Sequence, residues 1–181
     1  MSYKHFVEDI KHNVERFKSK PAIYYKNNSL NKWVGISWTD FGNSIEQSSK
    51  ALLKFGIEPQ ENIGVLSENK PEWIISDISI MSIRAVTIPI YATNSKKEVE
   101  YIVNDAEIRV LFVGGQEEYN KALEISKSNE YLKLIIALDK NTILEKNENS
   151  VYLNDFISIE ADNSIEKELR KRHAECNLND L

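Results

Sequence analysis

The chain has 181 residues, enough for one domain of ordinary size, and its 41% hydrophobic and 28% charged residues are typical of a globular protein. The formal net charge of -5 argues against a broad attraction to nucleic acid, and no apolar run approaches the roughly 20 residues that span a bilayer. Met1 to Lys20 has scattered charges and no apolar centre, so we expect no signal peptide and a soluble, cytoplasmic protein without a nucleic-acid partner.

The N-terminal quarter predicts two helices around a hairpin. Apolar residues recur at spacings of three and four over residues 3–18, which indicates an amphipathic helix. Two runs rich in aromatic and branched residues, 22–25 and 32–38, are separated by turn-forming residues and predict an antiparallel hairpin at a sheet edge. The next helix should begin after an N-cap at Thr39 and end at Gly56, where glycine favours a left-handed backbone.

Residues 62–91 form the central unit of the predicted fold. A short apolar strand at 63–66 is followed by turn chemistry, in which Asn69 is the expected N-cap and Pro71 occupies the first helical turn. The helix that follows is apolar on most of its circumference and should be buried, and 86–90 returns to a strand. Two strands joined by a helix make a right-handed parallel crossover.

The rest of the chain continues the alternation of strands and helices. We expect a helix opened by a capping box at Ser95 and Glu98, a strand at 110–113, a helix at 117–127, a strand at 132–138, a polar loop at 139–150, a short strand at 151–156 and a helix capped by Asn163. This order predicts an α/β fold with three αβα layers and a mostly parallel sheet, with residues 1–181 as one unit.

Candidate ligand-binding residues lie where strands end. Tyr91, Thr93 and Asn94 follow a strand at the carboxyl edge where open parallel sheets bind ligands, so they are candidate substrate-binding residues; alternatively they only lead into the next helix. Gly114-Gly115 sits between a strand and a helix and could cradle a phosphate, but glutamates in the next turn favour a simple tight turn. No catalytic residue is predicted.

No metal site is predicted either. His5 and His12 are seven residues apart on roughly one helix face, but no third ligand accompanies them in the sequence. The single Cys176 excludes an intrachain disulfide and a cysteine-based metal cluster, and nothing beside it suggests an activated thiol. The basic run at 167–173 is interpreted as a solvated helix face, with an anionic partner as the alternative.

Residues 63–95 read IGVLSENKPEWIISDISIMSIRAVTIPIYATNS, and this stretch resembles the N-terminal part of the adenylate-forming (AMP-binding) ligases, most closely the long-chain fatty acid:CoA ligases (acyl-CoA synthetases). The shared patterns are Leu-Ser-Glu-Asn-x-Pro-Glu-Trp and Ala-Val-x-x-Pro-Ile-Tyr-x-Thr, and weaker similarity extends over residues 15–140. One departure is Arg84, which stands where family members usually have glycine.

The resemblance implies that a longer parent enzyme activates a fatty acid with ATP and Mg2+ to an acyl-adenylate and transfers the acyl group to CoA. The family's phosphate loop and later motifs are not found here, so we expect a truncated N-terminal fragment that binds no cofactor, is inactive alone and self-associates. The resemblance places Tyr91 and its neighbours on the side where CoA and acyl substrate approach, and allows the parent enzyme to associate peripherally with a membrane. The alternative is a self-sufficient flavodoxin-like or receiver-like α/β module that binds a partner or small ligand.

Overall fold

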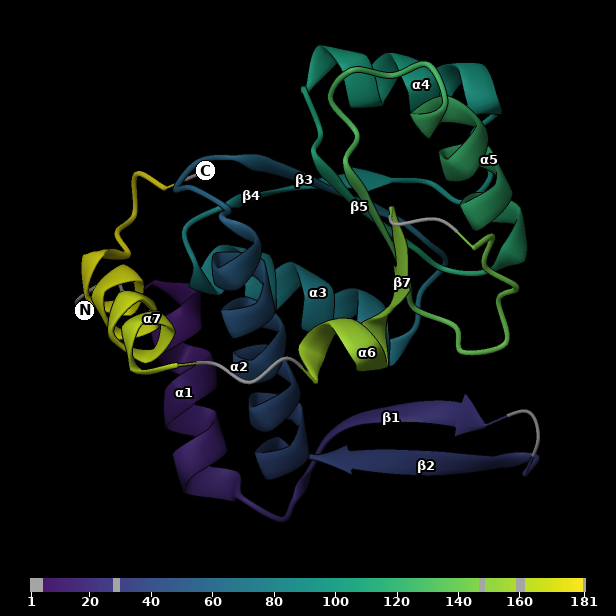
Figure 1. Ribbon diagram of the computed structural model, residues 1–181. Coiled ribbons are helices and arrows are strands. Elements are labelled where there is room, and N and C mark those ends of the chain that lie inside the picture. Colours follow the sequence, from purple (N-terminus) through teal and green to yellow (C-terminus); the bar gives the residue numbers. More distant parts are fainter. Residues whose placement is uncertain (1–4, 28–29, 147–148, 159–161, 181) are drawn as a thin grey trace.

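The centre of the molecule is a five-stranded sheet in the order β4-β3-β5-β6-β7, in which every neighbouring pair is parallel (Figure 1). This computed structural model describes residues 5–27, 30–146, 149–158 and 162–180. The elements are α1 (Phe6–Phe17), β1 (Pro21–Asn27), β2 (Lys32–Ser37), α2 (Trp38–Phe55), β3 (Asn62–Leu66), α3 (Pro71–Ser82), β4 (Val86–Ile90), α4 (Lys96–Asp105), β5 (Val110–Val113), α5 (Gln116–Ser126), β6 (Leu134–Ala137), β7 (Ser150–Tyr152), α6 (Leu153–Ile157) and α7 (Asn163–Glu175).

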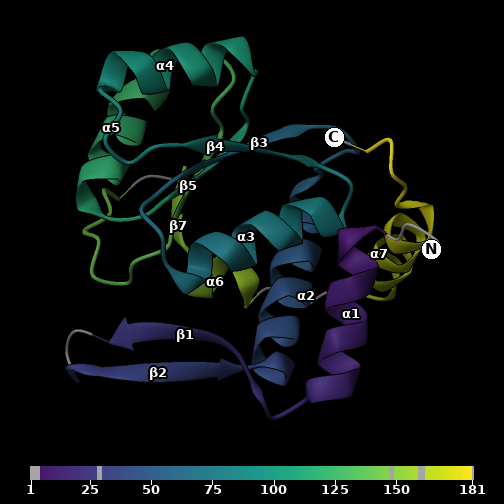
Figure 2. The ribbon, with the colours of Figure 1, turned by 180° about the vertical axis from the view of Figure 1, so that it is seen from behind.

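Helices cover both faces of the sheet, as the three-layer prediction requires. Alternate residues of the buried strands point to opposite sides, so Phe112 packs toward α2, α3 and α6, whereas Leu111 and Val113 pack toward α4 and α5. Figures 1 and 2 show α4 and α5 together on one side and α2, α3 and α6 on the other. The three-layer αβα fold with a parallel sheet is therefore confirmed.

The N-terminal elements extend this core. A third apolar cluster joins α1, α2 and α3 through Ile10, Phe41 and Ile78. Strands β1 and β2 pair antiparallel, as predicted, but they form a separate two-stranded sheet instead of an edge of the main sheet. The hairpin projects beside α3 and α6 in both ribbon views.

Several predicted boundaries are wrong by a few residues. Ser37 rather than Thr39 caps α2, with its hydroxyl accepting from the amide of Asp40. Lys70, which makes no side-chain capping bond, precedes α3 in place of Asn69. Asp162 rather than Asn163 caps α7.

The predicted strand at 151–156 is split between two elements. Residues up to Tyr152 pair with β6, but Leu153 begins the short helix α6. The change places Leu153 and Phe156, three residues apart, on one side of a helical turn, where both are buried in the cluster below the sheet.

Arg84 adopts the left-handed backbone that glycine takes most easily, with φ of 63°. Its amide donates to the carbonyl of Met81 in the last turn of α3, and its own carbonyl accepts from the amide of Gln60. The guanidinium forms two 3.0 Å hydrogen bonds with the carboxylate of Asp180 and reaches Glu175 at 3.2 Å. The arginine thus ties the end of α3 to the segment that follows α7.

The basic run at 167–173 is only partly a solvated face. Arg172 is 5% exposed, donates to the carbonyl of Ile83 at 3.0 Å and pairs with Glu168 on its own helix. It therefore anchors α7 to the end of α3. Within the described residues, no helix is both long and apolar enough to cross a membrane.

Candidate functional site

Three strands of the main sheet end at the same level. Leu66 of β3 pairs in register with Ile90 of β4 and with Val113 of β5. The residues that follow these strands therefore emerge together at the carboxyl edge of the sheet. The chain leaves β3 toward α3 on one face and leaves β5 toward α5 on the other, and such a switch of direction opens the usual ligand-binding crevice of parallel sheets.

The crevice between β3 and β5 is filled by backbone. The amide of Gly114 donates to the carbonyl of Leu66 at 2.9 Å, and the Lys70 ammonium donates to the Gly114 carbonyl at 2.5 Å. A Cβ atom added at Gly114 would lie 2.4 Å from Oγ of Ser67 and 3.0 Å from its Cα. The close approach of the two loops requires glycine at position 114. The first glycine of the Gly114-Gly115 pair is therefore explained by packing.

A groove of about 560 Å³ opens beside this contact, between the hairpin and the start of α3. Its walls are aromatic and aliphatic, and Lys70 provides a positive charge at the sheet edge. The groove is lined by Ile23, Tyr24, Tyr25, Lys26, Trp33, Asn69, Lys70, Pro71, Trp73 and Ile74. A concave, largely apolar surface with a few polar groups suits an apolar ligand with an anionic end.

The three predicted substrate-binding residues lie in the loop after β4, at the same edge. Tyr91 is 80% exposed, and its carbonyl accepts from the amide of Asn94 at 3.0 Å in a turn that leads to the capping box of α4. The Lys121 ammonium of α5 donates to the carbonyls of Ala92 and Asn94. Among the described residues, Tyr91, Thr93 and Asn94 line neither this groove nor the one described below. Their role in substrate binding stays a prediction.

The Gly114-Gly115 turn does not fit a nucleotide phosphate. Gly115 precedes α5, whose first turn contains Glu117 and Glu118, and Oε2 of Glu118 would lie 3.3 Å from a Cβ at Gly115. Carboxylates at this position already complement the helix dipole and repel an anion. The geometry therefore favours a tight turn over a phosphate site.

A second groove, of about 350 Å³, lies between α1, α2 and α7 and contains two unusual titratable groups. Burial lowers the pKa of His173 to about 4, and burial also lowers the pKa of Lys11. Perturbed pKa values are frequent at functional sites, but this groove lies within a helical layer away from the strand ends. The groove beside the hairpin remains the better candidate, because it adjoins the carboxyl edge of the sheet.

The sequence pattern alone does not predict the groove beside the hairpin. Its walls come from segments some forty residues apart, which the hairpin's position beside α3 brings together. The sequence contains one signal for it: the predicted hairpin contains aromatic residues such as Tyr24 and Trp33, and a two-stranded hairpin has little core in which to bury them. In the structure these two side chains are 63% and 68% exposed. Lys70 had no distinguishing sequence feature beyond its place after a buried strand.

The parallel sheet with helices on both faces defines a three-layer α/β protein, and the groove beside the hairpin adjoins the carboxyl edge of that sheet. A family model described as "AMP-binding enzyme" matches residues 10–175. The match covers most of the chain, and the chain therefore belongs to the AMP-binding enzyme family.

Curated relatives include human long-chain-fatty-acid–CoA ligase ACSBG2, which is 29% identical over 153 residues, or 84% of this chain and 22% of the relative. Long-chain-fatty-acid–CoA ligase FadD15 of Mycobacterium bovis is 27% identical over 106 residues, covering 59% of this chain and 18% of its own. The chain thus spans about a fifth of the length of these relatives. The sequence resemblance to acyl-CoA ligases is confirmed.

Solved structures support the same fold. The anthranilate CoA ligase AuaEII, crystallised with anthranoyl-AMP, superposes with a TM-score of 0.74 at 24% identity, over 88% of this chain and 30% of that one. Coronafacic acid ligase from Pectobacterium brasiliense gives a TM-score of 0.75 at 18% identity, over 87% and 30%. Both comparisons show that the chain shares the fold of these structures over most of its length.

Proposed function

We propose that this chain is the N-terminal part of a long-chain fatty acid:CoA ligase. The parent enzyme, the longer protein that contains the chain, would activate a carboxylate with ATP and Mg2+ to an acyl-adenylate and pass the acyl group to CoA. The observation that carries the proposal is the 29% identity to a human long-chain ligase across 84% of the chain, together with the family match over residues 10–175.

Within that enzyme, the chain would supply scaffold and one wall of the substrate site. Three features support this role: the aromatic groove beside the hairpin, the positive charge of Lys70 at the sheet edge, and the exposed loop that contains Tyr91. An acyl chain is apolar and CoA is anionic, so both parts of the groove have a matching ligand chemistry. Catalysis would depend on residues outside this chain.

The proposal is tested by the activity of the intact parent enzyme. Pyrophosphate release and acyl-CoA formation are measured with ATP, Mg2+, CoA and saturated fatty acids of increasing length. We expect both products to form with a long-chain fatty acid. Failure to form either product with any fatty acid, from a protein that is folded by circular dichroism, would refute the assigned reaction.

Variants of the parent enzyme test the proposed substrate-side loop. Tyr91→Ala, Thr93→Ala and Asn94→Ala should each lower kcat/KM by about five- to tenfold, the effect of losing one contact of roughly 1 kcal/mol. Tyr101→Ala is the matched control, since Tyr101 is an exposed tyrosine of the following helix α4. If kcat/KM of the three loop variants equals that of Tyr101→Ala, the loop has no role in substrate binding.

The isolated chain should release no pyrophosphate from ATP and fatty acid. Transfer chemistry of this kind depends mainly on charged and polar groups that hold phosphates in place, and the Gly114-Gly115 turn does not offer them. Fatty-acid-dependent pyrophosphate release by the pure 181-residue chain would contradict this part of the proposal.

We also propose that the isolated chain self-associates. Among the described residues, β4 and β7 are the outer strands of the main sheet, and Trp33 and Leu30 of the hairpin region are exposed. Open strand edges and exposed apolar side chains favour pairing with another copy. Sedimentation velocity over a concentration series should show a growing oligomer fraction, and a single monomeric species throughout would rule this out.

A further inference from the structure

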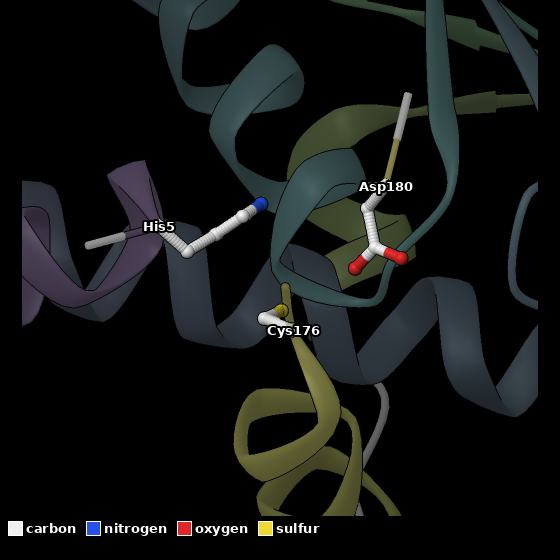
Figure 3. Close-up of side chains that lie close together, drawn as sticks. All are labelled: His5, Cys176 and Asp180. Carbon is white, nitrogen blue, oxygen red and sulfur yellow. The ribbon is translucent and has the colours of Figure 1, made fainter. Parts of the chain in front are cut away.

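Three potential metal ligands meet where the two ends of the chain come together. His5 precedes α1, Cys176 follows α7, and Asp180 lies in the terminal turn (Figure 3). One ligand atom from each residue lies within 4.8 Å of those of the other two. Figure 3 shows the three side chains directed toward a common space. Histidine, cysteine and carboxylate are the side chains that bind zinc.

We propose that His5, Cys176 and Asp180 form a binding site for a borderline-soft divalent cation of the zinc class. In a tetrahedral site with ordinary zinc bond lengths, ligand atoms lie roughly 3.3–3.7 Å apart. Side-chain rotations that draw the three groups together by about 1 Å would reach that spacing. Water would complete the coordination, as it does in other sites with three protein ligands.

The backbone around the site is already ordered. The amide of Cys176 donates to the carbonyl of Arg172 at 3.0 Å, and the amide of Asp180 donates to the carbonyl of Asn177 at 3.1 Å. His5 has an extended backbone, and its Nδ1 accepts weakly from the amide of Val7 at 3.4 Å. Metal binding can replace this long hydrogen bond at little cost, because such a bond is near the limit of useful geometry.

Asp180 has partners that must be reconciled with a metal. Each oxygen of its carboxylate accepts from Arg84 at 3.0 Å; Oδ2 also accepts from the backbone amide of Asn177 at 3.2 Å, and Oδ1 from the Asn177 side-chain amide at 3.3 Å. A metal at one oxygen would displace the longer Asn177 contact and leave Arg84 in place. Carboxylates that bind metals are commonly hydrogen-bonded by a further residue that fixes their orientation.

The local charges are balanced with a cation present. Arg84 also pairs with Glu175 at 3.2 Å, so two carboxylates surround one guanidinium. The two positive charges of a divalent cation and that of Arg84 together balance the negative charges of Asp180, Glu175 and the Cys176 thiolate. The occupied site would link the start of α1 to the end of α7, and binding energy would then contribute to folding stability.

Cobalt(II) provides a direct test, because a tetrahedral thiolate complex has a charge-transfer band in the near ultraviolet. Cys176 is the single cysteine of the chain, so such a band can arise only from this residue. The reduced, metal-free 181-residue chain should develop the band with one equivalent of Co2+ and lose it when Zn2+ is added. Zn2+ should also raise the thermal midpoint.

Variants separate a built site from incidental thiol binding. Cys176→Ser should abolish the band, and His5→Gln and Asp180→Asn should each weaken Zn2+ binding by at least about tenfold, the smallest usual effect of removing even an outer partner. His12→Gln is the matched control: His12 lies in α1, the helix that His5 precedes, its imidazole is exposed, and the variant should bind normally. Circular dichroism without metal checks that each variant is folded.

Two results would overturn the proposal. One is the absence of a thiolate–cobalt band from the folded wild-type chain. The other is a metal affinity that His5→Gln and Asp180→Asn leave unchanged, or that His12→Gln lowers by the same factor as these two changes. In either case the thiol would bind metal without the other two ligands.

Discussion

The contact between Gly114 and Ser67 provides the sharpest test of the sheet edge. In Gly114→Ala the new methyl group would lie 2.4 Å from Oγ, 2.8 Å from Cβ and 3.0 Å from Cα of Ser67. A rotation of the serine side chain can move Oγ but not Cβ or Cα. The loops after β3 and β5 must therefore separate, and overpacking of this kind costs about 1–3 kcal/mol.

Gly115→Ala is the matched control at the next residue. A methyl group there would meet only Oε2 of Glu118, at 3.3 Å, and this flexible carboxylate can move away. The backbone of Gly115 is extended, so alanine fits it without strain and reduces the entropy of the unfolded chain. We expect Gly115→Ala to change the free energy of unfolding by less than about 0.5 kcal/mol, and Gly114→Ala to lower it by about 2–3 kcal/mol.

Urea denaturation followed by circular dichroism and tryptophan fluorescence measures both changes. The double variant Ser67→Gly with Gly114→Ala removes the Oγ and Cβ contacts and should recover at least about 1 kcal/mol relative to the sum of the single changes. A cost for Gly114→Ala no larger than that for Gly115→Ala would refute the close approach of the two loops and, with it, the filled crevice.

Three further predictions concern stability. Burial lowers the pKa of His173, which faces Lys11 and Glu46, to about 4 from 6.5, so protonation favours the unfolded chain. The free energy of unfolding should therefore fall by about 1–2 kcal/mol as pH falls from 6.5 to 4, a value already reduced because the imidazole is partly exposed. This loss should be absent in His173→Asn. Arg84→Gly should be more stable than Arg84→Ala by about 1 kcal/mol in urea, because both lose the ion pairs but only glycine relieves the left-handed backbone. Trp73→Ala should cost about 2–3 kcal/mol by thermal denaturation, below the value for a fully buried tryptophan, because Trp73 is only partly buried against the core.

Features set by neighbouring residues were predicted well from the sequence. The capping box of Ser95 and Glu98 is present in both directions, and Gly56 ends α2 with φ of 87°. The strands β3, β4 and β5 match their predicted residues closely. These features depend on interactions within a few residues, which a single sequence contains in full.

The region after β6 was predicted less well, because a short apolar run fits a strand and a helical turn equally. The apolar residues Val151, Leu153 and Phe156 predict one strand, although Asn154 and Asp155 between them are unfavourable in a strand. Packing below the sheet decides the outcome, since one helical turn buries both Leu153 and Phe156. Tertiary burial has outweighed the local pattern here.

Contacts of charged side chains with distant segments could not be predicted from the sequence pattern. Arg172 belongs to a run of basic residues and looks solvated, yet its guanidinium binds the carbonyl of Ile83 inside the molecule. The sequence spacing relates His5 to His12, whereas the structure brings His5 to Cys176 and Asp180. Neither contact leaves a periodic or compositional signal, because each partner lies in a distant segment.

The loop after β4, which we propose as part of the substrate wall, combines a backbone held by hydrogen bonds with an exposed tyrosine side chain. Lys121 binds the carbonyls of Ala92 and Asn94, and Lys70 binds that of Gly114, so two ammonium groups hold the loops after β4 and β5. A loop with satisfied carbonyls has less backbone freedom to lose when a ligand binds, which lowers the entropic cost of binding. The Tyr91 side chain, which is 80% exposed, is left available above this ordered backbone. The sheet edge is thus prearranged to present side chains, which is the property that the proposed substrate wall requires.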